Sequence, residues 1–491
     1  MNKIEVLQGM AEIKTIAENE ENDSKDFLPL KSYEMLGDPN RFVIIGGRGT
    51  GKTRLFCTLQ KENGFRQIIG VQKNMFYPNP DQAIFLAGYY HVGTNFPQGK
   101  VMEKLVRDQE TDLFWQGSLI FLLLDYFKGN QDVTDIAKEY FTNENFDILS
   151  QLGNQRKISK WISIIRDQQE DIECFLDDID GYLQETKAWI FLLYDSLDRI
   201  CPKYMDWFPF IRSLLSFWFT HLHRWRRLKC KIFLRSDLYE SDKLAFPDSS
   251  KLRANILVLE WDTVSLYRLL LKKMANAGNA EMLKYLQKTE NLISEAPDHA
   301  LGYIPAEKEI IIRRFVNRMI GEYMGKDAKK GVSYSWVPNH LQDTHGVLSP
   351  RSFLKCFSVA AARMCEKPSD VAALEGDRIL SPSMIQGAVQ EVSEDRVAEL
   401  EEEYPWLSRL KKALRGTTML MNKGEFISRI YMDLWEDSMQ EQLPASTPEG
   451  IFEMLEKLGI VFIARDGRVN VPEIYLHGFE MKKKGGLRRP K

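Results

Sequence analysis

The stretch FVIIGGRGTGKT, residues 42–53, decides the fold of this chain. Its four apolar residues are followed by a glycine-rich run, and Arg54-Leu55-Phe56 comes next, which predicts a strand, a loop and a helix. Glycines allow consecutive backbone N–H groups to turn towards an anion, and the following helix presents its positive end. We therefore expect a phosphate-binding loop here rather than only a glycine-rich turn.

The polar residues of the loop have predicted roles. The ammonium group of Lys52 is expected to reach the β- and γ-phosphates of a nucleoside triphosphate, and the hydroxyl of Thr53 is expected to ligate Mg²⁺. The predicted cofactors are ATP and Mg²⁺. The residues expected to bind the nucleotide are Gly46, Gly47, Arg48, Gly49, Thr50, Gly51, Lys52, Thr53, Arg54 and, from a later segment, Arg351.

The composition is that of an ordinary soluble protein. The 491 residues are 44% hydrophobic and 27% charged with a net charge of −3, so nothing global favours nucleic acid or an acidic membrane as partner. Residues 1–26 are polar, and the most apolar run, Leu119–Leu124, is too short to span a bilayer, so we expect a cytoplasmic protein without membrane contact. The six cysteines form no C-x-x-C pair and the seven histidines form no H-E-x-x-H motif, which argues against disulfides and zinc.

Short apolar runs predict the remaining strands of a sheet. Helical patterns lie between these runs, and apolar strands that alternate with helices indicate a parallel α/β sheet. The long interval from about residue 57 to 180 exceeds what one strand connection needs, which predicts a helical insertion. The predicted strands are Ala83–Ala87, Trp189–Tyr194, Cys230–Leu234 and Ile256–Leu259.

The pattern changes after Trp261. Helical spacing at Val264–Met274, Glu307–Tyr323 and Ser352–Cys365 predicts an all-α second domain. Further on, two predicted helices are followed by the hairpin pattern of residues 461–471, with Asp466-Gly467 at its turn. This order of elements suggests a winged helix.

Two acidic residues follow the predicted strand Trp189–Tyr194. Asp195 lies where a carboxylate would hold the Mg²⁺ shell, and Asp198 is expected to orient or deprotonate the attacking water. The alternative is that both acids only begin a solvated helix.

Arg235 directly follows the predicted strand Cys230–Leu234. It would therefore emerge at the carboxyl edge of the sheet, where parallel α/β sheets bind ligands. We expect its guanidinium to read the γ-phosphate, the alternative being a salt bridge with Asp237. Arg351, at the start of a helix of the second domain, is expected to reach the nucleotide from there. The predicted catalytic residues are Lys52, Asp195, Asp198 and Arg235, and the predicted metal ligands are Thr53 and Asp195.

Three motifs together carry a resemblance to a known family. GGRGTGKT at 46–53, LLYDSLDR at 192–199 and IFLRSD at 232–237 resemble the STAND branch of P-loop ATPases, and the D-x-L-D-R form is most similar to the KAP ATPases. These families resemble AAA+ proteins in having a helical lid, and often a winged helix, after the core. The resemblance implies that Lys52 and Thr53 match the Walker A pair, Asp195 the Walker B metal residue, Asp198 the second acid, Arg235 the sensor arginine and Ser349-Pro350-Arg351 the lid motif.

The chain departs from both families. It lacks the transmembrane helices of KAP proteins, and Ser196 stands where AAA+ machines have a glutamate after the Walker B aspartate. We therefore expect a slowly hydrolysing switch ATPase that controls homo-oligomeric assembly with an effector or sensor protein. The pattern also resembles stand-alone bacterial P-loop ATPases encoded near anti-phage defence genes, which implies a role in prokaryotic immunity.

The predicted fold class is α/β, a parallel-sheet P-loop NTPase core with a helical insertion, then a helical lid and a winged-helix-like domain. The N-terminal segment is expected to pack near the nucleotide base or against the core edge. The predicted bounds are 1–40 for that segment, 41–262 for the core with its insertion at about 90–180, 263–400 for the lid, and 401–491 for the last domain with its basic tail.

The main alternative is a DNA-binding AAA+-like ATPase, an initiator or transposition-type loader. The predicted recognition helix Thr447–Leu458 carries three glutamates and one lysine, and acidic side chains repel a phosphate backbone. The tail is basic from Lys482 to Lys491 and is either a nucleic-acid contact or a solvated end. A third possibility is a nucleotide-binding scaffold without turnover.

Two further charged segments have open interpretations. The basic cluster HRWRR at 223–227 either supplies an arginine finger to a neighbouring subunit or solvates a helix end. The acidic stretch Glu391–Glu403 is expected to be a solvated helix face that joins the lid to the tail.

Overall fold

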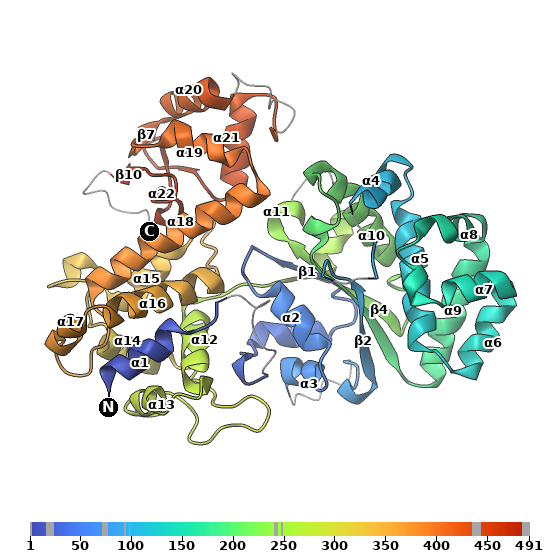
Figure 1. The fold of residues 1–491 in the computed structure, drawn as a ribbon, viewed down its shortest axis with the longest axis horizontal. Coiled ribbons are helices and arrows are strands. Elements are labelled where there is room, and N and C mark those ends of the chain that lie inside the picture. The colour runs from blue at the N-terminus through green and yellow to red at the C-terminus, as the bar shows by residue number, and fades with distance from the viewer. Residues whose placement is uncertain are drawn as a thin grey trace. The chain divides into compact units, whose positions relative to one another are not determined.

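The computed structural model describes residues 2–15, 24–70, 77–92, 95–97, 99–239, 244–246, 249–434 and 443–483. The chain forms two compact units, which are described separately (Figure 1). The α/β unit comprises residues 29–47 and 51–259. The helical unit comprises residues 1–28, 48–50 and 260–491. The predicted basic tail lies outside the described residues from Lys484 onwards.

A five-stranded parallel sheet forms the centre of the α/β unit, which confirms the predicted fold class. Its order is β2-β3-β4-β1-β5, so β4 lies between the loop strand β1 and β3. The register places Gly46 beside Arg235, and Tyr194 beside Ile232. The carboxyl ends of three neighbouring strands therefore meet at one edge. The strands are β1 Val43–Gly46, β2 Ala83–Tyr89, β3 Trp189–Tyr194, β4 Leu228–Arg235 and β5 Ile256–Val258.

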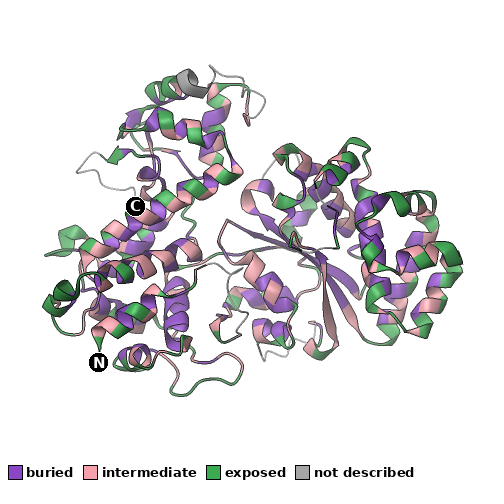
Figure 2. Ribbon diagram, viewed as in Figure 1, coloured by how far each residue is buried: buried purple, intermediate pink, exposed green. Residues whose placement is uncertain are grey.

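Helices cover the sheet and fill the long interval between β2 and β3. The strands β1 and β4 are buried along their whole length (Figure 2). Strand β1 is accordingly apolar throughout, whereas β4 also contains the buried Lys229 and Lys231. Trp115 of α5 donates its indole N–H to the carbonyl of Phe210 in α10 at 2.9 Å, which joins the insertion to the layer on the sheet. The helices are α2 Lys52–Leu59, α3 Gly64–Ile69, α4 Lys100–Arg107, α5 Thr111–Tyr126, α6 Gln131–Tyr140, α7 Asn143–Leu149, α8 Ile162–Asp167, α9 Gln169–Glu185, α10 Trp207–His221 and α11 Ser236–Tyr239.

The helical unit begins with the N-terminal helix α1, which packs on α13 and α16. The expectation that this segment packs near the nucleotide base or the core edge is therefore wrong for α1, because Val6, Leu7 and Met10 are buried within the helical unit. The helices are α1 Lys3–Ala11, α12 Thr263–Asn276, α13 Ala280–Gln287, α14 Glu309–Met319, α15 Ser333–Leu341, α16 Pro350–Cys365, α17 Pro368–Ala373 and α18 Pro382–Glu403.

The last ninety residues of the helical unit combine short helices with small sheets. The predicted hairpin is present, since Phe462 pairs with Asn470 and Ile463 with Val469 in antiparallel register, and Gly467 has a φ of +80° at the turn. A three-stranded antiparallel sheet beside three helices is the arrangement of a winged helix. The elements are α19 Leu407–Leu414, β6 Thr418–Met419, β7 Met421–Asn422, α20 Lys423–Leu434, α21 Pro448–Lys457, β8 Phe462–Ile463, β9 Arg468–Asn470, α22 Glu473–Leu476 and β10 Lys482–Lys483.

Within the described ranges, none of the helices combines the length and the apolar character that crossing a lipid bilayer requires.

Candidate nucleotide-binding site

The glycine-rich loop joins β1 to α2 at the carboxyl edge of the sheet. Gly51 precedes α2 with a φ of +97°, and Gly49 has a φ of +75°. Both values lie in the left-handed region that L side chains rarely adopt, which explains these two glycines. Helix α2 begins directly at Lys52, so its first backbone N–H groups face the loop, as an anion site at a helix N-terminus requires. Arg54 lies in the first turn of the same helix.

The ammonium group of Lys52 lies over this loop. Its Nζ donates hydrogen bonds to the carbonyl oxygens of Gly46 and Gly47, both at 2.8 Å. Burial lowers the pKa of Lys52 to about 8, although the carboxylate of Asp195 acts in the opposite direction. Phosphate oxygens are better acceptors than carbonyls for an ammonium with few solvent contacts. Lys52 is therefore placed to bind a phosphate chain on the loop.

Thr53 and Asp195 form the second part of the site. The Thr53 hydroxyl donates to Asp195 Oδ2 at 2.8 Å, and Asp195, directly after β3, is only 3% exposed. Burial raises the pKa of Asp195, although Thr53 and Lys52 act to lower it. Two oxygens that are adjacent ligands of an octahedral Mg²⁺ at about 2.05 Å lie about 2.9 Å apart. The spacing and chemistry of this pair therefore fit a shared Mg²⁺.

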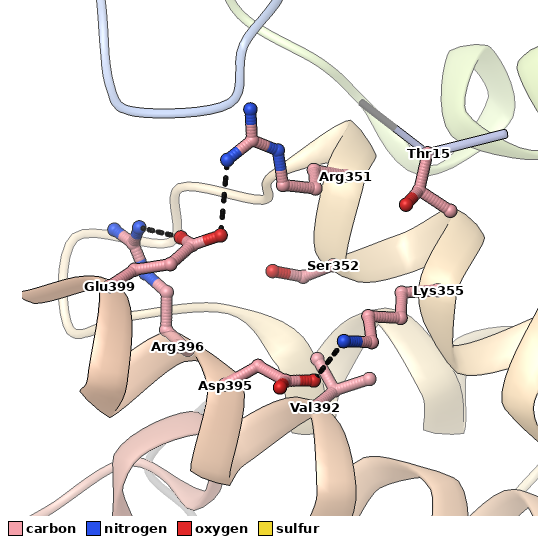
Figure 3. Close-up of a pocket in the computed structure, with 8 residues that line it drawn as sticks. All are labelled: Thr15, Arg351, Ser352, Lys355, Val392, Asp395, Arg396 and Glu399. Carbon is pink, nitrogen blue, oxygen red and sulfur yellow. Dashed lines mark hydrogen bonds and ion pairs between the residues drawn. The ribbon is translucent and has the colours of Figure 1, made fainter. Parts of the chain in front are cut away.

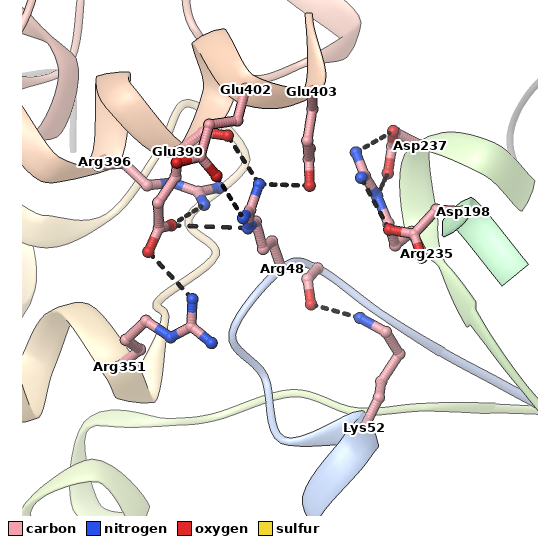
Figure 4. A network of polar contacts seen from close by, with 11 residues as sticks. Arg48, Lys52, Asp198, Arg235, Asp237, Arg351, Arg396, Glu399, Glu402 and Glu403 are labelled. Atoms are coloured by element: carbon pink, nitrogen blue, oxygen red, sulfur yellow. Dashed lines mark hydrogen bonds and ion pairs between the residues drawn. The ribbon is translucent and has the colours of Figure 1, made fainter. Parts of the chain in front are cut away.

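Arg235 lies between two carboxylates at the end of β4. Its Nε and Nη2 donate to the two oxygens of Asp237 at 3.0 and 2.8 Å, and its Nη1 donates to Asp198 Oδ2 at 3.2 Å (Figure 4). Arg235 is 7% exposed, and Asp198 lies in the short 3-10 helix Leu197–Arg199 that follows Asp195. The salt bridge with Asp237, which the sequence offered as an alternative to the sensor role, is thus present together with a contact to the predicted catalytic acid.

The α/β unit brings four of the predicted residues together. Lys52, Asp195, Asp198 and Arg235 come from the ends of three adjacent strands, and the charges of the other three all influence the pKa of Lys52. With Asp237 included, the cluster has two cations and three carboxylates.

Arg48 of the loop and Arg351 of α16 have acidic partners within the helical unit. Arg351 donates to Glu399 of α18 at 3.1 Å, Arg396 donates to the same carboxylate at 3.2 Å, and Arg48 donates to the Glu399 carbonyl at 2.7 Å (Figure 4). Arg48 also forms an ion pair with Glu403. Burial acts to raise the pKa of Glu399, but the three arginines hold it below its ordinary value.

These contacts correct the expectation of a solvated acidic face at Glu391–Glu403 for Glu399 and Glu403, whereas Glu394 and Glu402 are exposed as expected. Glu399 and Glu403 have side chains only 24% and 15% exposed, and both are neutralised by arginines. Val392, Val397 and Leu400 of the same helix are buried. This part of α18 is therefore packed and charge-paired.

A small pocket of the helical unit lies beside Glu399, between α16 and α18 (Figure 3). Its charged lining is internally paired, since Lys355 forms an ion pair with Asp395, and Arg351 and Arg396 both pair with Glu399. Three cations thus face two carboxylates in the lining, a formal charge of +1, although each cation has a carboxylate partner.

The basic cluster at 223–227 is tied to helix α9. Arg224 forms ion pairs with Asp177 and Glu173, and the buried Trp225 donates its indole N–H to Asp177 at 2.8 Å. The carboxylate of Asp180 accepts the backbone N–H groups of residues 226, 227 and 228 at 2.7–2.9 Å. The cluster precedes β4, so it lies at the amino end of the strand that has Arg235 at its carboxyl end. Arg224 thus holds the turn between α10 and β4, and His223, Arg224 and Arg226 are exposed just after the end of α10, which agrees with the solvated helix end considered for the cluster.

Sequence reasoning did not identify the role of Glu399 or the double contact of Arg235. For the double contact of Arg235, the spacing of Arg235 and Asp237 in the sequence was a local signal. No signal in the sequence connects Arg48 with Glu399, because 351 residues separate them.

Comparisons with known proteins add a likeness to solved structures. No protein-family model matches the chain, and no curated protein matches its sequence. A Walker-type ATPase of Pyrococcus abyssi is 11% identical with a TM-score of 0.38, over 91% of this chain and 93% of that one. The ORC2 protein of Aeropyrum pernix is 11% identical with a TM-score of 0.36, over 89% and 84%. Cdc6p from Pyrobaculum aerophilum is 10% identical with a TM-score of 0.26, over 89% and 86%. At such low scores, the function has to be argued from the geometry of this chain.

Proposed function

We propose that this chain binds MgATP at the carboxyl edge of its parallel sheet and hydrolyses it slowly, as a switch that controls assembly with a partner protein. The observation that carries the proposal is the contact of the Thr53 hydroxyl with the buried Asp195 carboxylate at 2.8 Å, beside a lysine that lies over the glycine-rich loop. A phosphate cradle, an ammonium group and a magnesium-type ligand pair are the parts that phosphoryl transfer requires.

The proposed roles follow from the positions of the side chains. Lys52 binds the β- and γ-phosphates, and Thr53 and Asp195 hold Mg²⁺, which neutralises charge on the phosphates when it is bound. Asp198 orients the attacking water and accepts its proton. Arg235 binds the γ-phosphate and stabilises the charge that develops during the transfer.

Two features support slow turnover. The residue after Asp195 is Ser196, whose side chain has no carboxylate that could activate water. The backbone φ of Ser196 is +59°. Asp198 is itself bound to Arg235, so it has to exchange this contact before it can act on water.

The switch part of the proposal concerns the helical unit. Arg351 donates to Glu399, so a contact with the nucleotide requires Arg351 to replace this carboxylate by a phosphate. ATP would then favour the conformation in which the exchange has occurred, and hydrolysis would release it. We propose homo-oligomeric assembly with an effector or sensor protein as the readout. Anti-phage defence, which the motif resemblance implies, is the proposed biological setting.

Two measurements test the proposal. Lys52→Ala is expected to lose ATP binding in a calorimetric titration, whereas Lys104→Ala, whose side chain is 68% exposed on α4, keeps it. Asp198→Ala is expected to retain ATP and to remain in the assembled form by native mass measurement. Equal affinity of wild type and Lys52→Ala for ATP would refute nucleotide binding at this loop. Unchanged turnover in Asp198→Ala would remove that residue from the mechanism.

A DNA-binding ATPase remains the second candidate, favoured by the winged-helix arrangement of α19–α21 with β7–β9 and by the cations Lys482 and Lys483 in β10. Arg468 at the hairpin turn is already paired with Asp466, and Lys483 is paired with Glu473. The test is duplex DNA binding against salt concentration, with and without residues 482–491. A steep slope that the truncation flattens would support this candidate over the protein-assembly switch.

A further inference from the structure

The guanidinium group of Arg235 is held on two sides by carboxylates of the α/β unit. Asp237 occupies the edge formed by Nε and Nη2, with a donor–acceptor pair at 3.0 Å and another at 2.8 Å. Such a two-point contact fixes the plane of the guanidinium as well as its position. Nη1 then faces Asp198 at 3.2 Å, the longest of the three contacts.

The backbone of Arg235 lies beside the start of the loop. Arg235 pairs in register with Gly46, and the carbonyl of Gly46 accepts from Lys52. Strand β4, which ends at Arg235, lies between β1 and β3, so Arg235 and Asp198 lie at the carboxyl edge from which the glycine-rich loop starts. A γ-phosphate bound by Lys52 therefore lies within reach of the field of Arg235.

The competing interpretation is a purely structural ion pair. A buried arginine needs a counter-charge, and breaking its only pair is strongly destabilising. Asp237 alone would satisfy that need through its two hydrogen bonds. The contact with Asp198 is not needed as a counter-charge. Asp198 belongs to the 3-10 helix after the neighbouring strand β3, and it is the proposed base.

We propose that Asp237 is a positioning residue that aims Arg235 so that its Nη1 exchanges Asp198 for the γ-phosphate of ATP. The exchange frees the Asp198 carboxylate for the attacking water only when a third phosphate is present. ADP has no γ-phosphate to compete with Asp198. Arg235 therefore stays bound to the carboxylate of Asp198, the proposed base. The inference rests on the proposed ATP site and adds a γ-phosphate-dependent release of the base.

The test compares the binding of ATP with that of ADP by wild type and three variants. Wild type, Asp237→Asn, Arg235→Ala and the double variant are titrated with each nucleotide, and turnover and the thermal midpoint are measured in parallel. The amide of Asn has one acceptor oxygen in place of the two that the guanidinium edge uses, and it carries no charge. Asp147→Asn, at an exposed position of α7, is the matched control.

We expect wild type to bind ATP more tightly than ADP and Asp237→Asn to lose this preference. We also expect the kcat of Asp237→Asn to fall by on the order of ten- to a hundredfold, because the loss of one preorganised hydrogen-bond donor to the transition state has an effect of this size. The double variant should be no worse than Arg235→Ala, because both changes remove the same function.

The outcomes separate this inference from the proposed function. A lower thermal midpoint of Asp237→Asn with unchanged kcat and unchanged ATP preference means a structural ion pair and overturns the inference. Equal affinity of wild type for ATP and ADP also overturns it but leaves ATP binding intact. Wild type that binds neither nucleotide refutes the proposed function, and the inference with it.

Discussion

The pH dependence of ATP affinity is the most quantitative prediction. Burial lowers the pKa of Lys52 from its ordinary value of 10.5 to about 8. Phosphates bind the protonated form, so affinity is nearly complete at pH 7, about one unit below this pKa, and is lost as the pH rises through about 8. With this pKa, the protonated fraction falls from about 0.91 at pH 7 to about 0.09 at pH 9, and the apparent Kd should rise about tenfold.

The assay is calorimetric titration of MgATP at pH 7, 8 and 9 with constant free Mg²⁺, and the matched control is Lys52→Arg. Arginine keeps its charge over this range, so any affinity that Lys52→Arg retains should not change with pH. A wild-type affinity that is constant from pH 7 to 9 would refute the argument, because it would mean that the free protein keeps Lys52 fully charged despite its burial.

Three further predictions concern other parts of the structure. Asp195→Asn should raise the Mg²⁺ concentration needed for half-maximal ATP binding by at least about tenfold, because a charged metal ligand becomes neutral; an unchanged Mg²⁺ titration would contradict the metal role. Glu399→Gln should strengthen ATP binding about three- to tenfold, because Arg351 loses the competing carboxylate, and equal or weaker binding by a folded variant would contradict this competition. Asp180→Ala should lower the free energy of unfolding in urea by about 3 kcal/mol or more, since three backbone N–H groups lose their acceptor; a loss below about 1 kcal/mol would show that water replaces the carboxylate.

The sheet could be predicted closely where a strand is buried on both faces. Trp189–Tyr194 is a continuous apolar run, and β3 has those same bounds. The strand β4 begins two residues before the predicted Cys230, since it includes Lys229. A buried lysine interrupts the apolar pattern, but here its ammonium donates to the carbonyl of Leu222, so the strand can continue through it.

The candidate site was predictable where its residues follow strands directly. The loop glycines, Asp195 and Arg235 follow apolar runs directly, and Lys52 begins the helix after the loop. The topology of a parallel sheet therefore brings them together. The partners of Arg48 and Arg351 come from α18 and depend on tertiary packing, for which the sequence pattern offers no distance information. The same holds for Arg224, whose carboxylate partners lie about fifty residues earlier.

Multiple-turnover phosphate release from the purified chain is the direct test of slow ATP hydrolysis at the Lys52 loop. We expect slow but continuing release of phosphate from MgATP by wild type, and none by Lys52→Ala at the same protein concentration. Lys104→Ala should match wild type. Release that persists in Lys52→Ala would place hydrolysis elsewhere, and binding of ATP without any release by wild type would leave a nucleotide-binding scaffold in place of a switch ATPase.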